Sequence, residues 1–413
     1  MVPYLEKILS LNELRVFRAV YEAGPVSRIK IANGLNLTRA AISVITKRLI
    51  ELDLIIEVGK GMSRKRQGRR EVLLVVNPDA GFILSVQIAH NFVAFGLVNL
   101  NGKVITKETQ PFSLGSSPFD VLGFLSEALL KMLETHQIDH KRIFGMGVAL
   151  PGIVNYSRGS LNENSLKGWQ GFDVGTFLER QLNIKVLLEN DVKMLTLGEF
   201  QYGSGRHVND LVCLWLGDGI GAGIIHDGRL IRGITASAGE IGFNEFILEL
   251  PEKNSILIEG QPKYWSDILC FTNIRASIRR GVKEGWKTNL TELAEIPDFI
   301  HAVETGDPLG LYIFRLLSRI LSVVCCNLIY FINPQMFLLG GPLFNQLPRL
   351  VSEIRTHLRK KILRSPIENV EVKTSILGEN GVLIGGAALV LEDLFKDLVH
   401  KSMNSNYRNS APR

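Results

Sequence analysis

The stretch LWLGDGIGAGIIHDG, residues 214–228, carries two patterns that together indicate the fold. Apolar residues run into a turn that contains Gly217 and Gly219, and Asp227-Gly228 forms a second turn. Glycine lets backbone amides approach an anion closely, so the first turn resembles a phosphate cradle. Asp-Gly between two β-prone runs is a strong hairpin signal. The stretch therefore predicts a β-hairpin, and it leaves open whether the first turn binds a nucleotide.

The same hairpin theme occurs earlier in the chain. Residues 81–105 read as strand, turn, strand, turn and strand, with Asn101-Gly102 at one turn. Helical periodicity follows over 119–135, and a strand followed by a helix is predicted over 185–203. After the second hairpin the sequence predicts a helical region over 266–331. Two α/β halves that each begin with a hairpin predict two similar lobes around a cleft.

Composition narrows the class of protein. Of the 413 residues, 46% are hydrophobic and 21% are charged, which is ordinary for a soluble globular protein. The four cysteines form no C-x-x-C pair, so the sequence favours a reducing, cytoplasmic location over a disulfide framework. The first residues lack the pattern of a signal peptide. The apolar run at 320–332 is shorter than the roughly 20 residues that span a bilayer, and it predicts a buried helix.

Positive charge is concentrated at the N-terminus. Residues 1–75 contain 14 Lys and Arg against 7 Asp and Glu, a net charge of +7, whereas the whole chain carries +6. The remainder of the chain is therefore close to neutral. This asymmetry predicts an N-terminal module that faces a polyanion.

The N-terminal module has the pattern of a winged helix-turn-helix. Three helical segments follow the capping residues Ser10, Ser27 and Thr38, and a turn predicted at Gly34 joins the second and third helices. Two β-prone runs, 55–58 and 71–76, flank a basic loop that would form the wing. The alternative is a solvated basic loop on an ordinary helical cap. The predicted DNA contacts are Thr38, Arg39, Ser43 and Lys47 on the third helix and Arg64, Arg66, Arg69 and Arg70 in the wing.

The order of segments resembles the ROK family, named for repressors, open reading frames and kinases. The matching segments are 147–159, 188–199, 216–233, 238–243, 337–343 and 383–390. The resemblance implies an α/β fold: a winged helix-turn-helix followed by a two-lobed actin-like, sugar-kinase (ribonuclease H-like) domain. It is strongest toward the xylose- and N-acetylglucosamine-type repressors. The predicted domains are 1–76 for the head, 77–196 plus about 386–402 for lobe 1, and 197–385 for lobe 2.

Family kinases carry an Asp-x-Gly-x-Thr element in the first hairpin, and this chain departs from it. Gln87, Ala89 and Asn91 stand at the three positions, and a neutral amide cannot supply the charge that Mg²⁺ requires. In the second turn Asp218 replaces a Thr and would repel phosphate oxygens. We therefore expect no ATP, no magnesium and no phosphoryl transfer.

The resemblance implies that the sugar side of the cleft is retained. Asn190 and Asp191 match the family's Asn-Asp pair, and Glu240 matches its sugar-binding Glu. Asp267 is a further candidate, aligned across a poorly matched loop. The alternative is that these acids are structural or form turns.

The family's structural zinc is expected to be absent. Phe243 stands in place of the zinc-binding His, and residues 244–270 contain Cys270 alone, so a tetrahedral site cannot be built. The loop is then expected to be held by the aromatic side chains of Phe243, Phe246, Tyr264 and Trp265.

These observations predict a cytoplasmic, sugar-responsive DNA-binding regulator without catalytic residues, most simply a repressor of carbohydrate-utilisation genes. Its partners would be double-stranded operator DNA, a small sugar and a second copy of the chain in a homodimer or higher homo-oligomer, with no membrane. The competing hypothesis is an ATP-dependent ROK sugar kinase fused to a DNA-binding head. A third is a repressor whose effector is a phosphorylated sugar or a protein.

Overall fold

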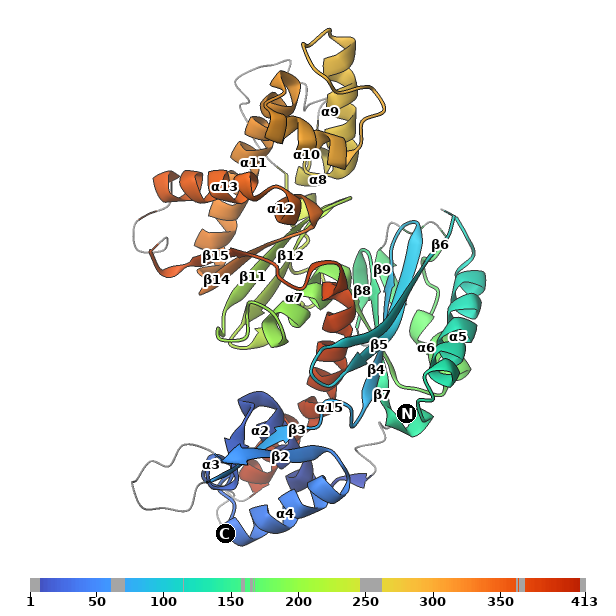
Figure 1. Ribbon diagram of the computed structural model, residues 1–413, viewed down its shortest axis with the longest axis vertical. Coiled ribbons are helices and arrows are strands. Elements are labelled where there is room, and N and C mark those ends of the chain that lie inside the picture. The colour runs from blue at the N-terminus through green and yellow to red at the C-terminus, as the bar shows by residue number, and fades with distance from the viewer. Residues whose placement is uncertain are drawn as a thin grey trace. The chain divides into compact units, whose positions relative to one another are not determined.

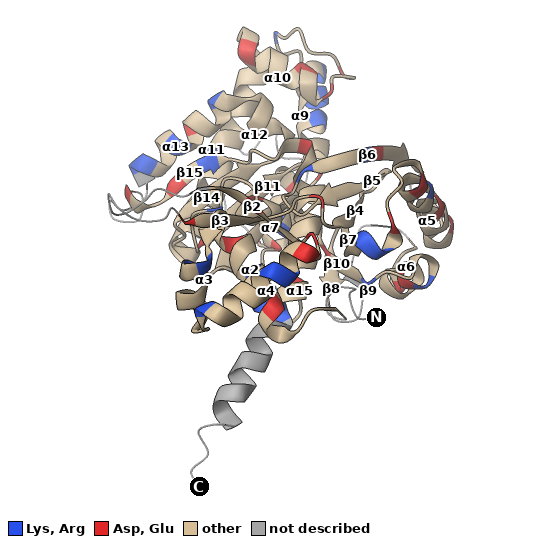
Figure 2. Cartoon of the chain, turned by 60° about the horizontal axis from the view of Figure 1, so that its bottom comes forward, with Lys and Arg blue, Asp and Glu red and all other residues tan. Residues whose placement is uncertain are grey.

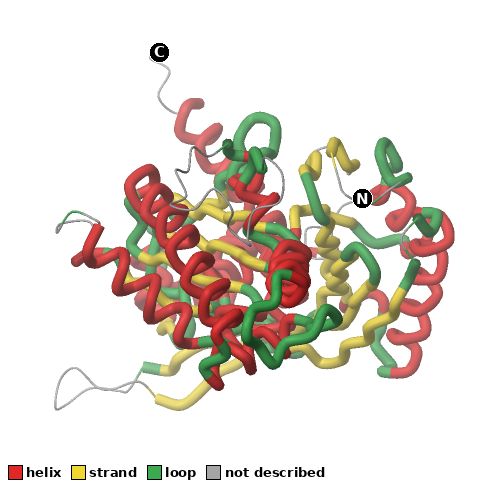
Figure 3. Tube along the Cα trace, turned by 90° about the horizontal axis from the view of Figure 1, so that it is seen from above, coloured by secondary structure: helices red, strands yellow, loops and turns green. Residues whose placement is uncertain are grey.

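The computed structural model describes residues 8–60, 71–113, 115–156, 160–163, 166, 168–245, 262–361, 363 and 368–408. The chain divides into two compact units. Met1–Asp191 and Val382–Arg413 form unit 1, and Val192–Gly381 form unit 2. Each unit combines a β-sheet with helices, as expected for an α/β protein (Figures 1 and 3).

The N-terminal part of unit 1 is a winged helix. Its elements are α2 (Leu11–Ala23), β1 (Val26–Ser27), α3 (Arg28–Leu35), α4 (Arg39–Glu51), β2 (Ile55–Lys60) and β3 (Val72–Val76). The strands form one antiparallel sheet in the order β1-β3-β2. Ser10, Ser27 and Thr38 each cap a helix, as predicted.

The turn between α3 and α4 lies beyond the predicted position. Gly34 is inside α3, and the helix ends at Asn36 with φ 53°. Asn is one of the few non-glycine residues that tolerate this left-handed conformation, because its short polar side chain can bond locally. The prediction of a turn at Gly34 was therefore wrong by about half a helical turn.

The central sheet of unit 1 follows the predicted hairpin pattern. Its strands run in the order β10 (Val186–Asn190), β7 (Ile143–Leu150), β4 (Phe82–Ile88), β5 (Phe92–Asn99) and β6 (Val104–Pro111). Strands β4, β5 and β6 are antiparallel, whereas β7 and β10 add in parallel. Helices α5 (Pro118–Thr135) and α6 (Val174–Leu182) cover one face and share its apolar core (Figure 1). A short ribbon of β8 (Ile153–Asn155) and β9 (Ser160–Glu163) follows β7.

The other face of this sheet receives α15 (Gly381–Arg408) at very short range. A Cβ at Gly147 on β7 would lie 2.7 Å from the Cα of Gly386 on α15. Further along the same helix, the ring of Phe395 packs on the winged helix, with ring centroids 6.0 Å from Phe17 and 5.6 Å from Tyr21. One helix therefore contacts both the central sheet and the winged-helix head.

Unit 2 contains a second five-stranded sheet. The strand order is β13 (Arg229–Leu230), β12 (Ile220–His226), β11 (Leu211–Leu216), β14 (Met336–Gly340) and β15 (Glu371–Thr374). Helices α9 (Phe271–Lys283), α10 (Ile296–Thr305), α11 (Pro308–Ile332) and α13 (Pro348–Lys361) supply most of the core on one face. Two short helices, α8 (Trp265–Ile268) and α12 (Pro342–Gln346), complete the packing.

The predicted helical region at 266–331 is four separate helices, α8 to α11. Residues between Lys283 and Ile296 leave the helical conformation, and Gly285 there has φ 79°. Pro297 lies in the first turn of α10, where a proline starts a helix readily because its missing N–H would have no partner. The sequence does not indicate this break, because apolar residues occur on both sides of it.

The apolar run at 320–332 belongs to the 25-residue helix α11, which is long and apolar enough to cross a membrane by composition alone. In the structure 61% of its most apolar window is buried inside the protein. The buried side chains contact the sheet and the neighbouring helices of unit 2. Helix α11 is therefore a core helix, as the sequence predicted.

Candidate functional site

The start of α4 presents the helix residues predicted to contact DNA. Arg39, Ser43 and Lys47 are exposed. Thr38 accepts a hydrogen bond from the backbone N–H of Ala41 at 3.2 Å, so its hydroxyl caps the helix. Ser43 donates to the backbone oxygen of Arg39 at 2.9 Å. The helix therefore offers two cations and one hydroxyl on its exposed side. The four wing residues Arg64, Arg66, Arg69 and Arg70 lie outside the described residues.

Other cations of the head hold the head together. Arg48 pairs with the buried carboxylate of Glu13 at 3.0 Å, and Arg28 pairs with Glu57 at 2.8 Å. Arg28 also donates to the hydroxyl of Thr46. Figure 2 marks basic and acidic residues on the ribbon of these elements. The number of Lys and Arg in the head therefore overstates the charge available to a partner.

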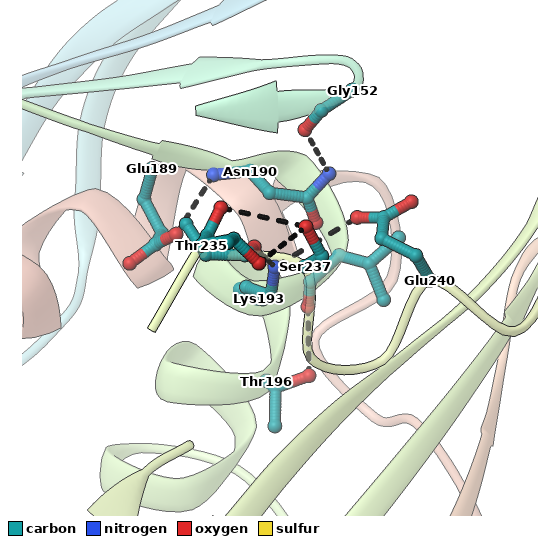
Figure 4. A network of polar contacts seen from close by, with 10 residues as sticks. Gly152, Glu189, Asn190, Lys193, Thr196, Thr235, Ser237 and Glu240 are labelled. Atoms are coloured by element: carbon teal, nitrogen blue, oxygen red, sulfur yellow. Dashed lines mark hydrogen bonds and ion pairs between the residues drawn. The ribbon is translucent and has the colours of Figure 1, made fainter. Parts of the chain in front are cut away.

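The predicted Asn-Asp pair lies at the junction of β10 and α7 (Asp191–Gln201). Asn190 ends the strand, is 6% exposed, and donates from Nδ2 to the backbone oxygen of Gly152 at 3.1 Å (Figure 4). Its backbone N–H donates to Oε1 of the buried Glu189 at 3.0 Å. These bonds fix the amide of Asn190. Asp191 is the first residue of α7, where the helix dipole favours a negative charge.

Glycines of the opening stretch position α7. A Cβ at Gly223 on β12 would lie 1.9 Å from Oγ1 of Thr196, and one at Gly221 would lie 3.3 Å from Val192. Both of these neighbours belong to α7. The two glycines therefore let α7 lie against the strand at a distance that larger residues would prevent. Their function in this chain is close helix–strand packing.

Lys193, two residues after Asp191, contacts the predicted sugar-binding Glu240. Its side chain is 1% exposed and donates to the backbone oxygen of Ala236 at 2.6 Å (Figure 4). Its Nζ lies 3.7 Å from Oε1 of Glu240. Burial raises the pKa of Glu240, and the Lys193 ammonium opposes that rise. The buried cation thus offsets part of the effect of burial on a carboxylate that could accept hydrogen bonds from a polyol.

Asp267 has a structural role in α8. Its Oδ2 accepts from the backbone N–H groups of Lys263 and Tyr264, both at 2.9 Å. This is the pattern of a capping carboxylate at the third position of a helix. Its assignment as a sugar ligand stays a prediction, and these bonds leave Oδ1 as its other acceptor.

The two turns that hold phosphate in family kinases bond internally in this chain. The N–H of Ala89 donates to the backbone oxygen of Phe92 at 2.9 Å, which closes the first hairpin. In the second turn the N–H of Gly217 donates to the oxygen of Gly219 at 2.9 Å. The oxygen of Gly217 accepts from Phe271 at the start of α9. The N–H groups of Ala89 and Gly217 are therefore already bonded within the protein.

The loop that is predicted to lack the family's zinc site is described at its two ends. The rings of Phe243 and Tyr264 pack edge to face, with their centroids 6.4 Å apart. Glu245 and Tyr264 form an isolated β-bridge, and Trp265 is buried. Phe246 lies outside the described residues. Cys270 caps α9 by accepting from the N–H of Asn273, and burial raises the pKa of its thiol. Within the described part of the chain, no three His, Cys, Asp or Glu side chains gather as a metal site.

Lys193 is the one residue of these contacts that the sequence did not indicate as a site residue. A single Lys in the helix of the Asn-Asp pair looks like an ordinary surface residue of an amphipathic helix. The available signal was the mostly apolar run that follows Lys193 directly, and the structure buries every residue from Lys193 to Glu199.

Comparison with known proteins shows where this architecture occurs. The ROK family profile matches residues 83–393. The xylose repressor of Caldicellulosiruptor bescii is 26% identical over 389 residues, which cover 93% of this chain and 96% of the repressor. A solved ROK family transcriptional regulator, described as a homologue of the Escherichia coli MLC protein, aligns with TM-score 0.79 and 25% identity. That alignment covers 95% of this chain and 98% of the regulator.

A kinase of the family shares the fold but less of the chain. The ROK family glucokinase of Streptomyces griseus, solved with glucose and AMPPNP, aligns with TM-score 0.63 and 22% identity. It covers 75% of this chain and 99% of its own length. The alignment thus uses the whole kinase and leaves a quarter of this chain unmatched.

Proposed function

The chain belongs to the ROK family, and from that premise we propose that it is a sugar-responsive DNA-binding transcriptional repressor. The observation that carries the proposal is the extent of the match. The named repressor covers 93% of this chain and the solved regulator 95%, so each match reaches into the winged helix, whereas the kinase covers 75%. A winged helix with an exposed, partly basic third helix is a typical DNA-reading module.

We assign sugar recognition to Asn190, Asp191 and Glu240. Carboxylates accept hydrogen bonds from sugar hydroxyls, and an amide both donates and accepts. The bonds that fix Asn190 and the ion pair between Lys193 and Glu240 support the assignment, because a binding site needs its polar groups already oriented. Asp267 is a further contact through Oδ1.

The regulatory mechanism in this proposal is thermodynamic linkage. Two copies of the chain place two α4 helices in successive major grooves of a palindromic operator. The basic wing contacts the DNA backbone. A sugar that binds one conformer better shifts the population toward it and changes the affinity for DNA. The protein acts in the cytoplasm, without zinc, ATP or magnesium.

Selection of DNA from a random duplex library by the full-length chain tests the function. We expect one sequence, with two related half-sites, to be enriched. Xylose, glucose and N-acetylglucosamine are then titrated into the complex, and one of them should change the DNA affinity. Asp191→Asn should keep DNA binding and lose the sugar response. A chain without residues 1–75 that bound the selected duplex as well as the full chain would overturn the proposal.

The competing activity, sugar phosphorylation, is tested with ATP and the same sugars. The departures at Gln87, Ala89 and Asp218 and the internally bonded turns predict no turnover. ATP-dependent phosphorylation that disappears in Asp191→Ala would instead support a kinase fused to a DNA-binding head.

A further inference from the structure

The exposed side of α4 carries an apolar residue at its centre. Ile42, Thr46 and Leu49 are buried against the rest of the head. Residues three, four and seven positions apart share one side of a helix, so Ala40, Val44 and Lys47 lie together on the opposite side. Val44 is 70% exposed.

Neither folding nor local packing accounts for a valine at this place. A β-branched residue lowers helix propensity, and an exposed side chain gains little from burial. Among the described residues of the winged helix, the other exposed large apolar side chains, Leu11, Ile29 and Leu52, are 37–40% exposed, so Val44 stands well apart from them.

The polar neighbours of Val44 define what it meets. Ser43 precedes it, and Lys47, one turn further on, makes a loose exposed contact of 3.8 Å with Glu51. Arg48 is turned away from this side by its bonds to Glu13 and to the backbone oxygen of Ile8. The middle of the reading side is therefore an apolar strip formed by Ala40 and Val44, bordered by Arg39, Ser43 and Lys47.

An apolar side chain in a major groove has one specific partner. The groove edges of the four base pairs present hydrogen-bond donors and acceptors, and thymine alone adds a methyl group. We propose that Val44, with Ala40 beside it, contacts the 5-methyl group of a thymine in each operator half-site and so selects an A·T pair at that position. This inference rests on the proposed DNA-binding function and names the base chemistry that the head recognises.

Removing single methyl groups from the selected duplex tests the inference. Each thymine is replaced in turn by uracil, which changes the base by one methyl group and keeps its hydrogen bonding. We expect one position per half-site at which this replacement weakens binding of the unaltered protein about fourfold, the value of one buried methyl group. Val44→Ala should bind the thymine and uracil duplexes at that position equally.

Lys47→Ala is the matched control on the same side of α4. It should weaken binding to both duplexes by the same factor and lower the salt dependence by about one counterion, because a lysine contacts phosphate without reading the base. Thermal unfolding checks that Val44→Ala is folded, which we expect since alanine is the better helix former.

The outcomes of this experiment separate the thymine-contact inference from the proposed DNA-binding function. A methyl-sensitive position that vanishes in Val44→Ala supports the inference. Methyl sensitivity that persists in Val44→Ala, or no methyl-sensitive position in an enriched duplex, overturns the inference and leaves DNA binding established. Failure to enrich any duplex overturns the proposed function, and the inference with it.

Discussion

Ser85 on β4 is the one buried side-chain polar atom without a hydrogen-bond partner among the described residues. Its hydroxyl faces α15, where a Cβ at Gly386 would lie 2.1 Å from Oγ. A buried hydroxyl without a partner costs free energy, so Ser85→Ala should raise the free energy of unfolding by about 1 kcal/mol. Urea denaturation measures the change.

Gly147→Ala, on the neighbouring strand, is the control for this prediction. Its Cβ would meet the backbone of Gly386 at 2.7 Å, which cannot move aside as a side chain can. We expect a loss of about 1–3 kcal/mol or more. If Ser85→Ala destabilised the protein as well, the hydroxyl would have a stabilising role that its burial does not suggest.

Glu240 makes stability depend on pH. Burial raises the pKa of Glu240 above the ordinary 4.5, so the folded state binds a proton at this carboxyl more tightly than the unfolded state does. The contribution to folding is therefore fully present below pH 4.5 and is lost as pH rises through the raised value. Relative to Glu240→Gln, the unaltered protein should lose stability over this interval. Denaturation of both proteins from about pH 4 to about pH 7 provides the comparison, and parallel curves would contradict the prediction.

At the residue scale the sequence indicates candidate site residues but not the contacts that they make. Asn190, Asp191 and Glu240 were chosen from motifs, but the ion pair of Lys193 with Glu240 depends on a contact between residues 47 positions apart. Asp267 is a candidate aligned across a poorly matched loop, and only the structure reveals that one of its oxygens caps α8. Such tertiary contacts leave no periodic signal in the sequence.

At the element scale α15 is the connection between the head and the first sheet. Phe395 is 5% exposed and packs on Phe17 and Tyr21 of α2. Phe395→Ala should therefore destabilise unit 1 by about 3–5 kcal/mol, while Phe395→Leu, which retains most of the volume, should cost less than about 1.5 kcal/mol. Urea denaturation followed by circular dichroism measures both. Equal stability of Phe395→Ala and the unaltered protein would show that the head folds independently of α15.

Elements were predictable where local chemistry sets their ends. The caps Ser10, Ser27 and Thr38 and the Asp227-Gly228 turn are local signals, and the structure has helices and a hairpin there. The sequence predicts one helical region over 266–331 where the structure has four helices. The buried residues on both sides of each helix boundary are apolar, so their pattern does not show where one helix ends. The end of α3 is predicted too early, because Gly34 is the more usual residue for a helix end than Asn36, where the helix is in fact capped.

At the scale of the whole molecule the proposed function requires reciprocity. If a sugar changes the affinity for operator DNA by some factor, the operator must change the affinity for that sugar by the same factor. Calorimetric titration of the effective sugar into the protein, with and without the selected duplex, should reproduce the factor obtained from DNA binding. Unequal factors would mean that the two ligands do not act on one equilibrium.

The two-lobed α/β architecture was predictable as a whole because hairpins, strands and helices recur in a family order along the chain. The function of individual glycines was not. Gly217 and Gly219 suggest a phosphate cradle in the sequence, whereas Gly221 and Gly223 of the same stretch make room for α7 in the structure. A glycine pattern indicates that another group lies close to the backbone. The sequence alone does not distinguish an anion from a helix as that group.

The contact between α2 and α15 joins residues that lie far apart in the sequence and are therefore translated at different times. A ribosome makes the head before α15, and Phe395, which packs on Phe17 and Tyr21, follows Phe17 by 378 residues (395 − 17). Domains generally fold as they are synthesised, N-terminal first. Phe17 and Tyr21 in the head of a nascent chain therefore lack this contact until Phe395 has been translated. We therefore expect a chain that ends before Phe395 to expose these two rings and to aggregate or be cleaved more readily than the full chain.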